Sequence, residues 1–100
     1  MILIIAPVQP FFLQTLEAQG EECIYLPDIT RDKLLTLIGG AKGLVVSTRI
    51  PIDAEIICRA DSLKWIARLG SGMEHIDTAT ATARGILCVS SPEEIGRAHV

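Results

Sequence analysis

Several features that mark particular classes of protein are scarce in this sequence. Aromatic residues make up only 4% of the chain, and its nine lysines and arginines are scattered rather than clustered. Binding to nucleic acid by counterion release needs a basic patch, and so does a helix that lies on an anionic membrane surface. With a formal net charge of -3, the chain is expected to bind neither nucleic acid nor membrane.

Long apolar runs are scarce as well. The longest run near the start, Met1–Val8, is much shorter than the about 20 residues that a membrane-spanning helix needs. It has neither a basic leader nor a small-residue cleavage site, so it does not match a signal peptide. We therefore expect a cytoplasmic protein.

The cysteines do not form a recognisable framework. Cys23, Cys58 and Cys88 are odd in number and widely spaced, without a C-x-x-C pair. This spacing supports neither a zinc site nor a set of disulfides. Because free cysteine commonly packs as a small hydrophobe, we expect three buried thiols.

What the chain has in quantity is aliphatic residues. Hydrophobic residues make up 49% and charged residues 21% of the sequence, a balance typical of a folded domain. One hundred residues suffice for about one domain. A core of Leu, Ile, Val and Ala suits helices packed on a buried parallel sheet.

Short apolar runs alternate with amphipathic stretches along the chain. Apolar runs predict strands at residues 1–6, 22–26, 43–46, 63–69 and 86–89. Helices are predicted at 11–19, between the N-cap Thr30 and the stop at Gly39-Gly40, at 53–60, and at 78–84 after the N-cap Asp77. Gly20 and Gly85 are expected to end two of these helices.

Five strands separated by helices predict parallel βαβ units with right-handed crossovers. The expected fold is α/β, a flavodoxin-like doubly wound parallel five-stranded sheet. Ligands of such sheets bind beyond the carboxyl ends of the strands, near the point where the strand order reverses. The segments to search are therefore 7–10, 47–51, 70–75 and 90–93.

The segment Gly70-Ser71-Gly72-Met73 directly follows the fourth predicted strand. Glycines on both sides of a small polar residue permit backbone angles that let successive N–H groups converge on an anion. A carboxylate or a phosphate would suit such a site. A tight turn without a ligand explains the same residues, because a lone G-x-G is a weak motif.

Arg49 follows the third predicted strand and offers a planar set of donors that matches a carboxylate. A solvated arginine, or one bridged to Asp53, is the alternative. His75 has no obvious carboxylate partner to orient it and sits in a short turn before Asp77, so a surface or turn residue is favoured over an acid–base catalyst. Trp65 is expected in the core.

Taken together, these segments resemble one family. The run Lys64–Asp77, KWIARLGSGMEHID, resembles the signature of D-2-hydroxyacid dehydrogenases, especially phosphoglycerate dehydrogenase-like members. Gly43–Arg49, Ala79–Ile86 and Ser90-Ser91-Pro92 resemble further segments of that family in the same order. The resemblance extends over residues 1–93, which we interpret as the substrate-binding domain.

The resemblance implies an enzyme that oxidises a D-2-hydroxy acid to a 2-oxo acid and passes hydride to NAD. It assigns the substrate carboxylate to the loop Gly70–Met73 and a distal acidic group to Arg49. Small 2-hydroxy or 2-oxo acids are the implied partners, in a homodimer or larger assembly. Ser47 stands where phosphoglycerate-type members often carry Arg, which weakens the case for a phosphorylated substrate.

In the family, the NAD-binding domain and the catalytic Arg, Glu and His follow after residue 100. The resemblance therefore implies a fragment that lacks catalytic residues and is inactive alone. Its relatives complete this domain with a helix from the C-terminal end of the chain. Residues 94–100 (EIGRAHV) resemble the translation of a sequencing adapter, and we interpret them as a non-native tail.

A flavodoxin-like signalling receiver needs an acidic pair after the first strand and an Asp after the third. The chain has Ala6-Pro7-Val8-Gln9 and Ser47-Thr48-Arg49 there, so this function is excluded. A stand-alone anion-binding or interaction module without catalysis remains the alternative.

Overall fold

The computed structural model of the chain describes residues 1–47, 49–69 and 73–90. The suspected tail at 94–100 lies outside the described residues. The strands are β1 (Ile2–Ile4), β2 (Cys23–Tyr25), β3 (Gly43–Val46), β4 (Trp65–Arg68) and β5 (Leu87–Ser90). The helices are α1 (Pro10–Ala18), α2 (Arg31–Leu37), a 3-10 turn η1 (Ile38–Gly40), α3 (Ala54–Arg59) and α4 (Thr78–Ala83).

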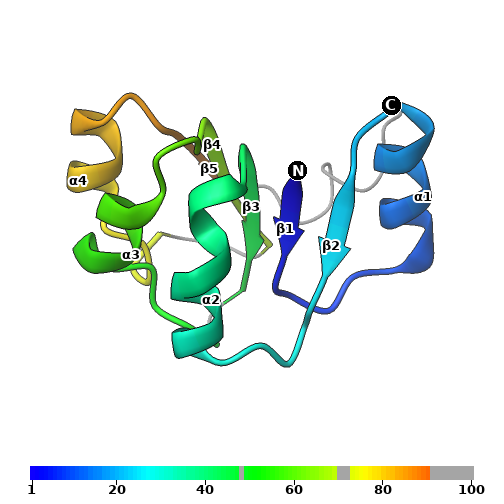
Figure 1. Ribbon diagram of the computed structural model, residues 1–100, viewed down its shortest axis with the longest axis horizontal. Coiled ribbons are helices and arrows are strands. Elements are labelled where there is room, and N and C mark those ends of the chain that lie inside the picture. Colours follow the sequence, from blue (N-terminus) through cyan, green and yellow to red (C-terminus); the bar gives the residue numbers. More distant parts are fainter. Residues whose placement is uncertain (48, 70–72, 91–100) are drawn as a thin grey trace.

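The five strands form one parallel sheet in the order β2-β1-β3-β4-β5 (Figure 1). The strand order reverses between β1 and β3, since β1 pairs with both β2 and β3. This is the flavodoxin-like order. The predicted α/β fold is therefore confirmed, and each predicted strand and helix is present with ends that differ by a few residues.

Side-chain caps begin three of the helices. Thr30, Asp53 and Asp77 accept hydrogen bonds from the N–H groups of the third residue that follows each of them. Each cap satisfies one of the N–H groups that a helix start leaves without a partner. Gly20 and Gly85, with φ of 87° and 77°, end α1 and α4 as predicted.

The α-helix ends at Leu37, two residues before the predicted stop at Gly39-Gly40, and the 3-10 turn η1 then continues through both glycines and ends at Gly40. The extra turn positions Ile38, which is fully buried, and the Ala41 N–H donates to the Ile38 carbonyl oxygen at 3.2 Å. Burial of a large aliphatic side chain outweighs the weak helix propensity of two glycines.

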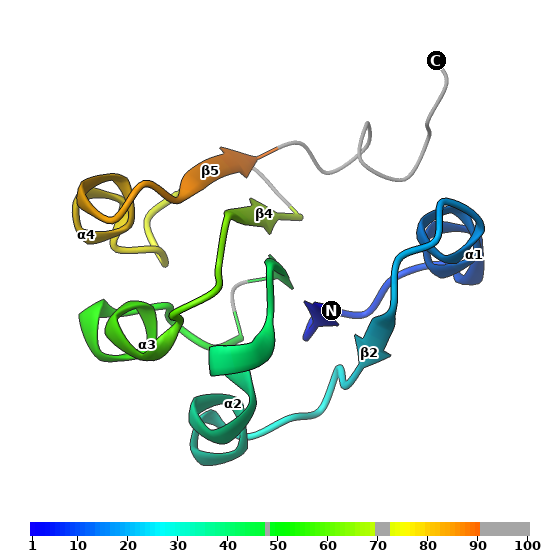
Figure 2. The ribbon, with the colours of Figure 1, turned by 45° about the horizontal axis from the view of Figure 1, so that its top comes forward.

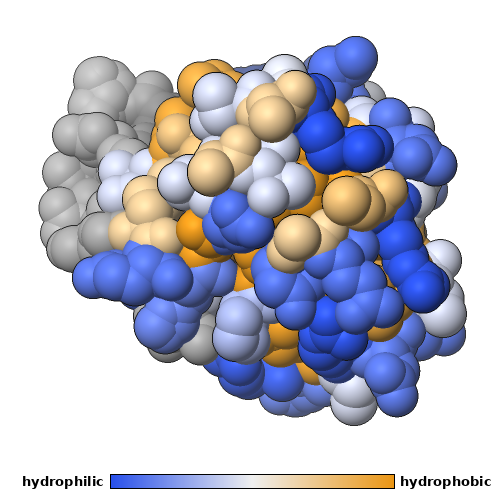
Figure 3. Space-filling view, turned by 90° about the vertical axis from the view of Figure 1, so that its left-hand side faces the viewer, coloured by the Kyte–Doolittle hydropathy of each residue, from blue (hydrophilic) through white to orange (hydrophobic). Residues whose placement is uncertain are grey.

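The helices cover the two faces of the sheet unequally, with α2, α3 and α4 on one face and α1 on the other (Figure 2). The larger core lies under the three helices and includes Leu3, Leu44, Ile66 and residues of each helix. The smaller core joins Phe12 of α1 to the other face of the sheet. On the outer side of α3 and α4, hydrophilic side chains are prominent, with apolar atoms showing between them (Figure 3). No described helix has the length and hydropathy needed to cross a membrane.

The expectation of three buried thiols is wrong for Cys58, which is exposed. Helix α3 directs its neighbours Ile56 and Ile57 into the core, and this leaves Cys58 on the solvent side. Cys23 and Cys88 are half-buried, and burial is the main cause that raises the pKa of each thiol. Trp65, expected in the core, is half-buried and packs against the smaller core cluster.

On the α1 face, the half of the sheet formed by β4 and β5 carries an apolar patch, which we define as Trp65, Leu69, Leu87 and Val89. Leu87 pairs with Trp65 in the sheet register, and Ala67 pairs with Val89. The side chain of Leu87 is 63% exposed, whereas its three companions are half-buried. Contiguous exposed apolar residues mark interaction or aggregation surfaces.

We expect the purified 100-residue chain to bind a hydrophobic dye and to associate as its concentration rises. Leu87→Gln should lower both effects, because it removes the most exposed side chain of the patch. Phe11→Gln is the matched control, since Phe11 is 54% exposed on α1 and outside the patch. Dye fluorescence and sedimentation of both variants test this, and equal behaviour of the two would contradict it.

Candidate anion site at the carboxyl edge of the sheet

The reversal of strand order places the ends of β1 and β3 side by side at the carboxyl edge of the sheet. Helices leave neighbouring strands of such a sheet toward opposite faces at this point, so the two loops diverge and leave a crevice. The loop after β3 carries Ser47, which is half-buried, and Arg49, which is exposed. The predicted search segment therefore lies at the place where this fold binds ligands.

Arg49 connects the loop after β3 to the start of α2. Its Nη2 donates a hydrogen bond to the backbone carbonyl oxygen of Ile29, which directly precedes Thr30, the N-cap of α2. A buried Ile29 fixes one end of this contact, while the exposed Arg49 keeps further N–H donors for an anion.

Arg49 does not form the bridge to Asp53 that the sequence left open. The Nη2 of Arg31 takes that place, at 2.8 Å from Asp53 Oδ2 and 2.8 Å from Glu55 Oε1. The pKa of Asp53 lies below its ordinary value, chiefly because the Ile56 N–H donates to it and secondly because of Arg31. This carboxylate therefore stabilises the fold above its unfolded pKa, and that contribution is lost as the pH falls through the folded pKa.

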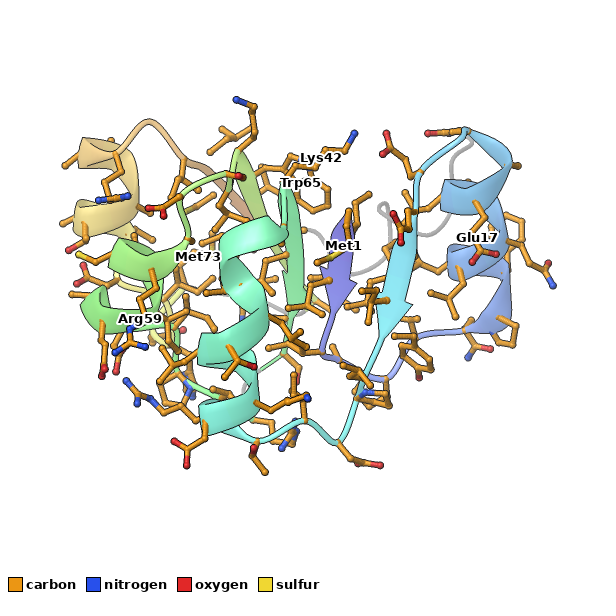
Figure 4. The ribbon with its side chains drawn as sticks, in the orientation of Figure 1. Met1, Glu17, Lys42, Arg59, Trp65 and Met73 are labelled. Atoms are coloured by element: carbon orange, nitrogen blue, oxygen red, sulfur yellow. The ribbon has the colours of Figure 1, made fainter. Side chains whose placement is uncertain are left out.

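Of the predicted carboxylate loop, Gly70, Ser71 and Gly72 lie outside the described residues. Met73 is half-buried and packs against the larger core, on the side of the sheet that α3 covers (Figure 4). Its carbonyl oxygen accepts a hydrogen bond from the Ile76 N–H at 3.1 Å. Because the side chain packs against the core, only the backbone of Met73 is left to contact an anion, and that contact stays a prediction.

The loops after β3 and β4 are tied to each other. The Ile52 N–H donates to the His75 carbonyl oxygen at 2.7 Å, and the Asp77 N–H donates to the Ile52 carbonyl oxygen at 2.9 Å. These two bonds form an isolated parallel bridge between Ile52 and Ile76. The segments that carry Arg49 and Met73 are thus joined by backbone hydrogen bonds, which fixes their relative position.

His75 lies in a shallow depression lined by residues 51–53 and 74–77. The lining includes the carboxylates of Asp53, Glu74 and Asp77, so its electrostatic character is acidic. His75 itself is half-buried, in agreement with the turn residue that the sequence favoured. The described residues contain no group of three or more His, Cys, Asp or Glu side chains suited to a metal ion.

Sequence reasoning passed over Arg68. It is the last residue of β4 and is only 7% exposed. Among the described residues it is the charged residue whose side chain is buried. Its strand partners are Val46 on β3 and Ser90 on β5. The signal in the sequence was a single charge at the end of an apolar strand, just before the Gly-Ser-Gly segment.

Comparison with protein families matches residues 2–97 to the D-isomer-specific 2-hydroxyacid dehydrogenase, catalytic domain, family model. The chain belongs to this family. It is 44% identical over 62 residues to D-3-phosphoglycerate dehydrogenase of Mycobacterium tuberculosis, which covers 62% of this chain and 12% of that protein. It is 34% identical over 92 residues to D-3-phosphoglycerate dehydrogenase of Methanocaldococcus jannaschii, which covers 92% of this chain and 17% of that protein.

A solved structure shows the same fold as this chain. The NAD⁺-bound 3-phosphoglycerate dehydrogenase of Entamoeba histolytica matches with a TM-score of 0.80 and 25% identity, over 89% of this chain and 32% of that one. The chain thus spans less than a third of the length of these relatives. The predicted resemblance is confirmed at the level of family and fold.

Proposed function

We propose that this segment forms the substrate-binding part of an NAD-dependent oxidoreductase that converts D-2-hydroxy acids to 2-oxo acids. Family membership supports the reaction class, and the position of the exposed Arg49 after β3, at the carboxyl edge where the strand order reverses, supports the site. The acid would bind at the carboxyl edge of the sheet. Its carboxylate would lie on backbone N–H groups of Gly70, Ser71, Gly72 and Met73, and its distal polar end would lie at Arg49.

Within this proposal, NAD is held by a domain that follows this segment in the complete enzyme. The depression beside His75 does not fit a dinucleotide, because its lining is acidic and would repel a pyrophosphate. We assign no catalytic residue to the described part of this chain. Its residues bind and orient the acid, and the assembly of the complete enzyme as a homodimer or larger oligomer rests on the resemblance alone.

Two observations favour different acids. The names of the curated relatives favour D-3-phosphoglycerate. Ser47 brings no positive charge to the edge where many phosphoglycerate-type enzymes carry an arginine, so Arg49 alone would face a phosphate on this loop. We therefore expect D-3-phosphoglycerate to be used less efficiently than an unphosphorylated D-2-hydroxy acid of similar size.

The role of Arg49 is tested in a full-length dehydrogenase that carries this segment. Arg49→Gln should raise the KM for the acid by about tenfold or more, since a hydrogen bond to a charged group contributes roughly 1.5–3 kcal/mol. The matched control is Arg31→Gln, which removes an arginine whose partners are Asp53 and Glu55. Equal changes of KM in the two variants would contradict a specific role for Arg49.

A further inference from the structure

Tyr25 reaches from the end of β2 to the loop that follows β1. Its phenolic oxygen accepts a hydrogen bond from the Val8 N–H at 3.2 Å. Strand alternation places its ring on the α1 face, because Cys23 packs against the smaller core and Ile24 against the larger one. The side chain of Val8 packs against that smaller core as well. A side chain of one strand thus holds the backbone of a neighbouring loop.

The backbone of Tyr25 is fixed by the sheet, whereas the loop after β1 has a single anchor of this kind. Tyr25 pairs with Ile4 in the register of β2 and β1, and the Leu26 N–H donates to the Ile4 carbonyl oxygen at 2.8 Å. Of the N–H groups at residues 6–9, that of Val8 is the one that donates a hydrogen bond within the described part of the chain. The Tyr25 hydroxyl therefore anchors the loop between the end of β1 and the start of α1.

Residues 25–29, which connect β2 to the N-cap of α2, reach the loop after β3 at their other end. The carbonyl oxygen of Ile29, a buried residue, accepts the hydrogen bond from Arg49. The Ile29 N–H donates to the Leu26 carbonyl oxygen at 3.2 Å, which closes this segment into a turn. Figure 1 shows that the connections from β1 to α1 and from β2 to α2 leave the sheet toward opposite sides. Residues 25–29 therefore contact both loops that flank the reversal of strand order.

A loop that is fixed before the ligand arrives favours binding, because a loop that becomes ordered only on binding lowers the affinity by the entropy that it loses. The loop after β1 lies across the strand-order reversal from the loop that carries Arg49. Its position therefore sets the room for an acid between the two loops. When the only hydrogen-bonding anchor at residues 6–9 is removed, this loop should become more mobile and the space beside it less strictly defined.

We infer that Tyr25 is a positioning residue that determines the size of the acid accepted at the proposed site. Its hydroxyl holds the loop after β1 in a fixed position relative to the loop that carries Arg49. This inference rests on the proposed function, and it adds a residue that acts through the backbone of Val8 rather than directly on the acid. Because Tyr25 acts through this loop, its effect should be on KM and on the choice between acids, with kcat almost unchanged.

The test uses a full-length dehydrogenase that carries this segment, with the variant Tyr25→Phe, which keeps the ring and removes the accepting oxygen. Thr36→Val is the matched control, since it removes an exposed hydroxyl that donates to the Lys33 carbonyl oxygen within α2. Amide hydrogen exchange of residues 6–9 reports the anchoring of the loop. Kinetics give KM and kcat for the D-2-hydroxy acid that the wild-type enzyme uses best, for the same acid lengthened by two methylene groups, and the KM for NAD.

We expect Tyr25→Phe to speed the exchange at residues 6–9 and to raise the KM for the preferred acid by roughly three- to fivefold, an effect typical of one hydrogen bond between neutral groups. The preference for the shorter acid over the longer one should fall by a similar factor. The kcat and the KM for NAD should stay within about twofold, and Thr36→Val should change none of these quantities. Thermal melts identify a variant that does not fold, and Tyr25→Met then takes the place of Tyr25→Phe.

Three results would overturn the inference while the proposed function stands. These are an unchanged exchange rate at residues 6–9 in Tyr25→Phe, an unchanged KM and acid preference despite faster exchange, and equal changes of KM in Tyr25→Phe and Thr36→Val. A wild-type enzyme that oxidises no D-2-hydroxy acid would overturn the proposed function itself, and the role of Tyr25 with it.

Discussion

The 100-residue chain, purified alone, is expected neither to bind NAD nor to oxidise a D-2-hydroxy acid. Hydride transfer needs a cofactor held against the substrate and a group within reach to accept the hydroxyl proton. The described residues offer an acidic depression beside His75, which would repel a pyrophosphate. The expected effect is a complete loss of turnover relative to a full-length dehydrogenase that carries this segment.

The measurement is NADH absorbance with D-lactate and D-3-phosphoglycerate as substrates, together with calorimetric titration of NAD into the chain. The full-length enzyme under the same conditions is the positive control. Turnover above the blank by the 100-residue chain would show that catalytic residues lie within it, and would contradict the assignment of catalysis to a following domain.

The second large effect is expected at Gly43, the first residue of β3. A Cβ atom added to Gly43 would lie 2.1 Å from Cζ2 and 2.4 Å from Cε2 of Trp65, its direct partner on β4. The indole ring, which lies at the amino end of the sheet near Lys42 (Figure 4), would have to leave the smaller core. Gly43→Ala should therefore destabilise the fold by about 2 kcal/mol, within the usual range for overpacking.

For a chain of this size, such a loss lowers the melting temperature by roughly 10 °C, which circular dichroism measures. Gly39→Ala is the matched control, because its Cβ would come no closer than 3.5 Å to a neighbouring atom. In a Trp65→Leu background the substitution at Gly43 should cost much less, since the ring that it displaces is gone. Similar melts for Gly43→Ala and Gly39→Ala would contradict this account of the β3–β4 pairing.

Local signals in the sequence predicted most of the architecture. Thr30 and Asp77 were recognisable as helix caps because a cap is made between residues three positions apart. Gly85 was recognisable as a helix end because positive φ strongly favours glycine. The five apolar runs and the spacing between them then predict a parallel sheet with helical crossovers.

Tertiary contacts decided what the sequence left open. Arg49 contacts the carbonyl oxygen of Ile29, and Arg31 takes the bridge to Asp53. Both outcomes depend on which loops meet at the carboxyl edge, twenty or more positions apart in the chain. Cys58 shows the same limit of sequence-based prediction. Apolar residues beside it in the sequence do not determine whether its side chain faces the core or the solvent.

The candidate site was predicted less completely than the fold. Arg49 and the Gly70–Met73 segment were selected from their positions after the third and fourth predicted strands, and their role in binding stays a prediction. Arg68 was missed because the sequence shows a charged residue at the end of an apolar strand but does not show that this residue is buried. Its exposure of 7% depends on the elements that pack around the end of β4, which the local sequence does not identify.

The most direct test of the proposed function is the stereospecificity of a full-length dehydrogenase that carries this segment. NAD reduction is measured with the D and L enantiomers of the same 2-hydroxy acids, phosphorylated and unphosphorylated. We expect reduction of NAD with the D enantiomers and no rate above the blank with the L enantiomers. Equal rates with both enantiomers, or reduction of NAD with the L enantiomers alone, would contradict the proposal.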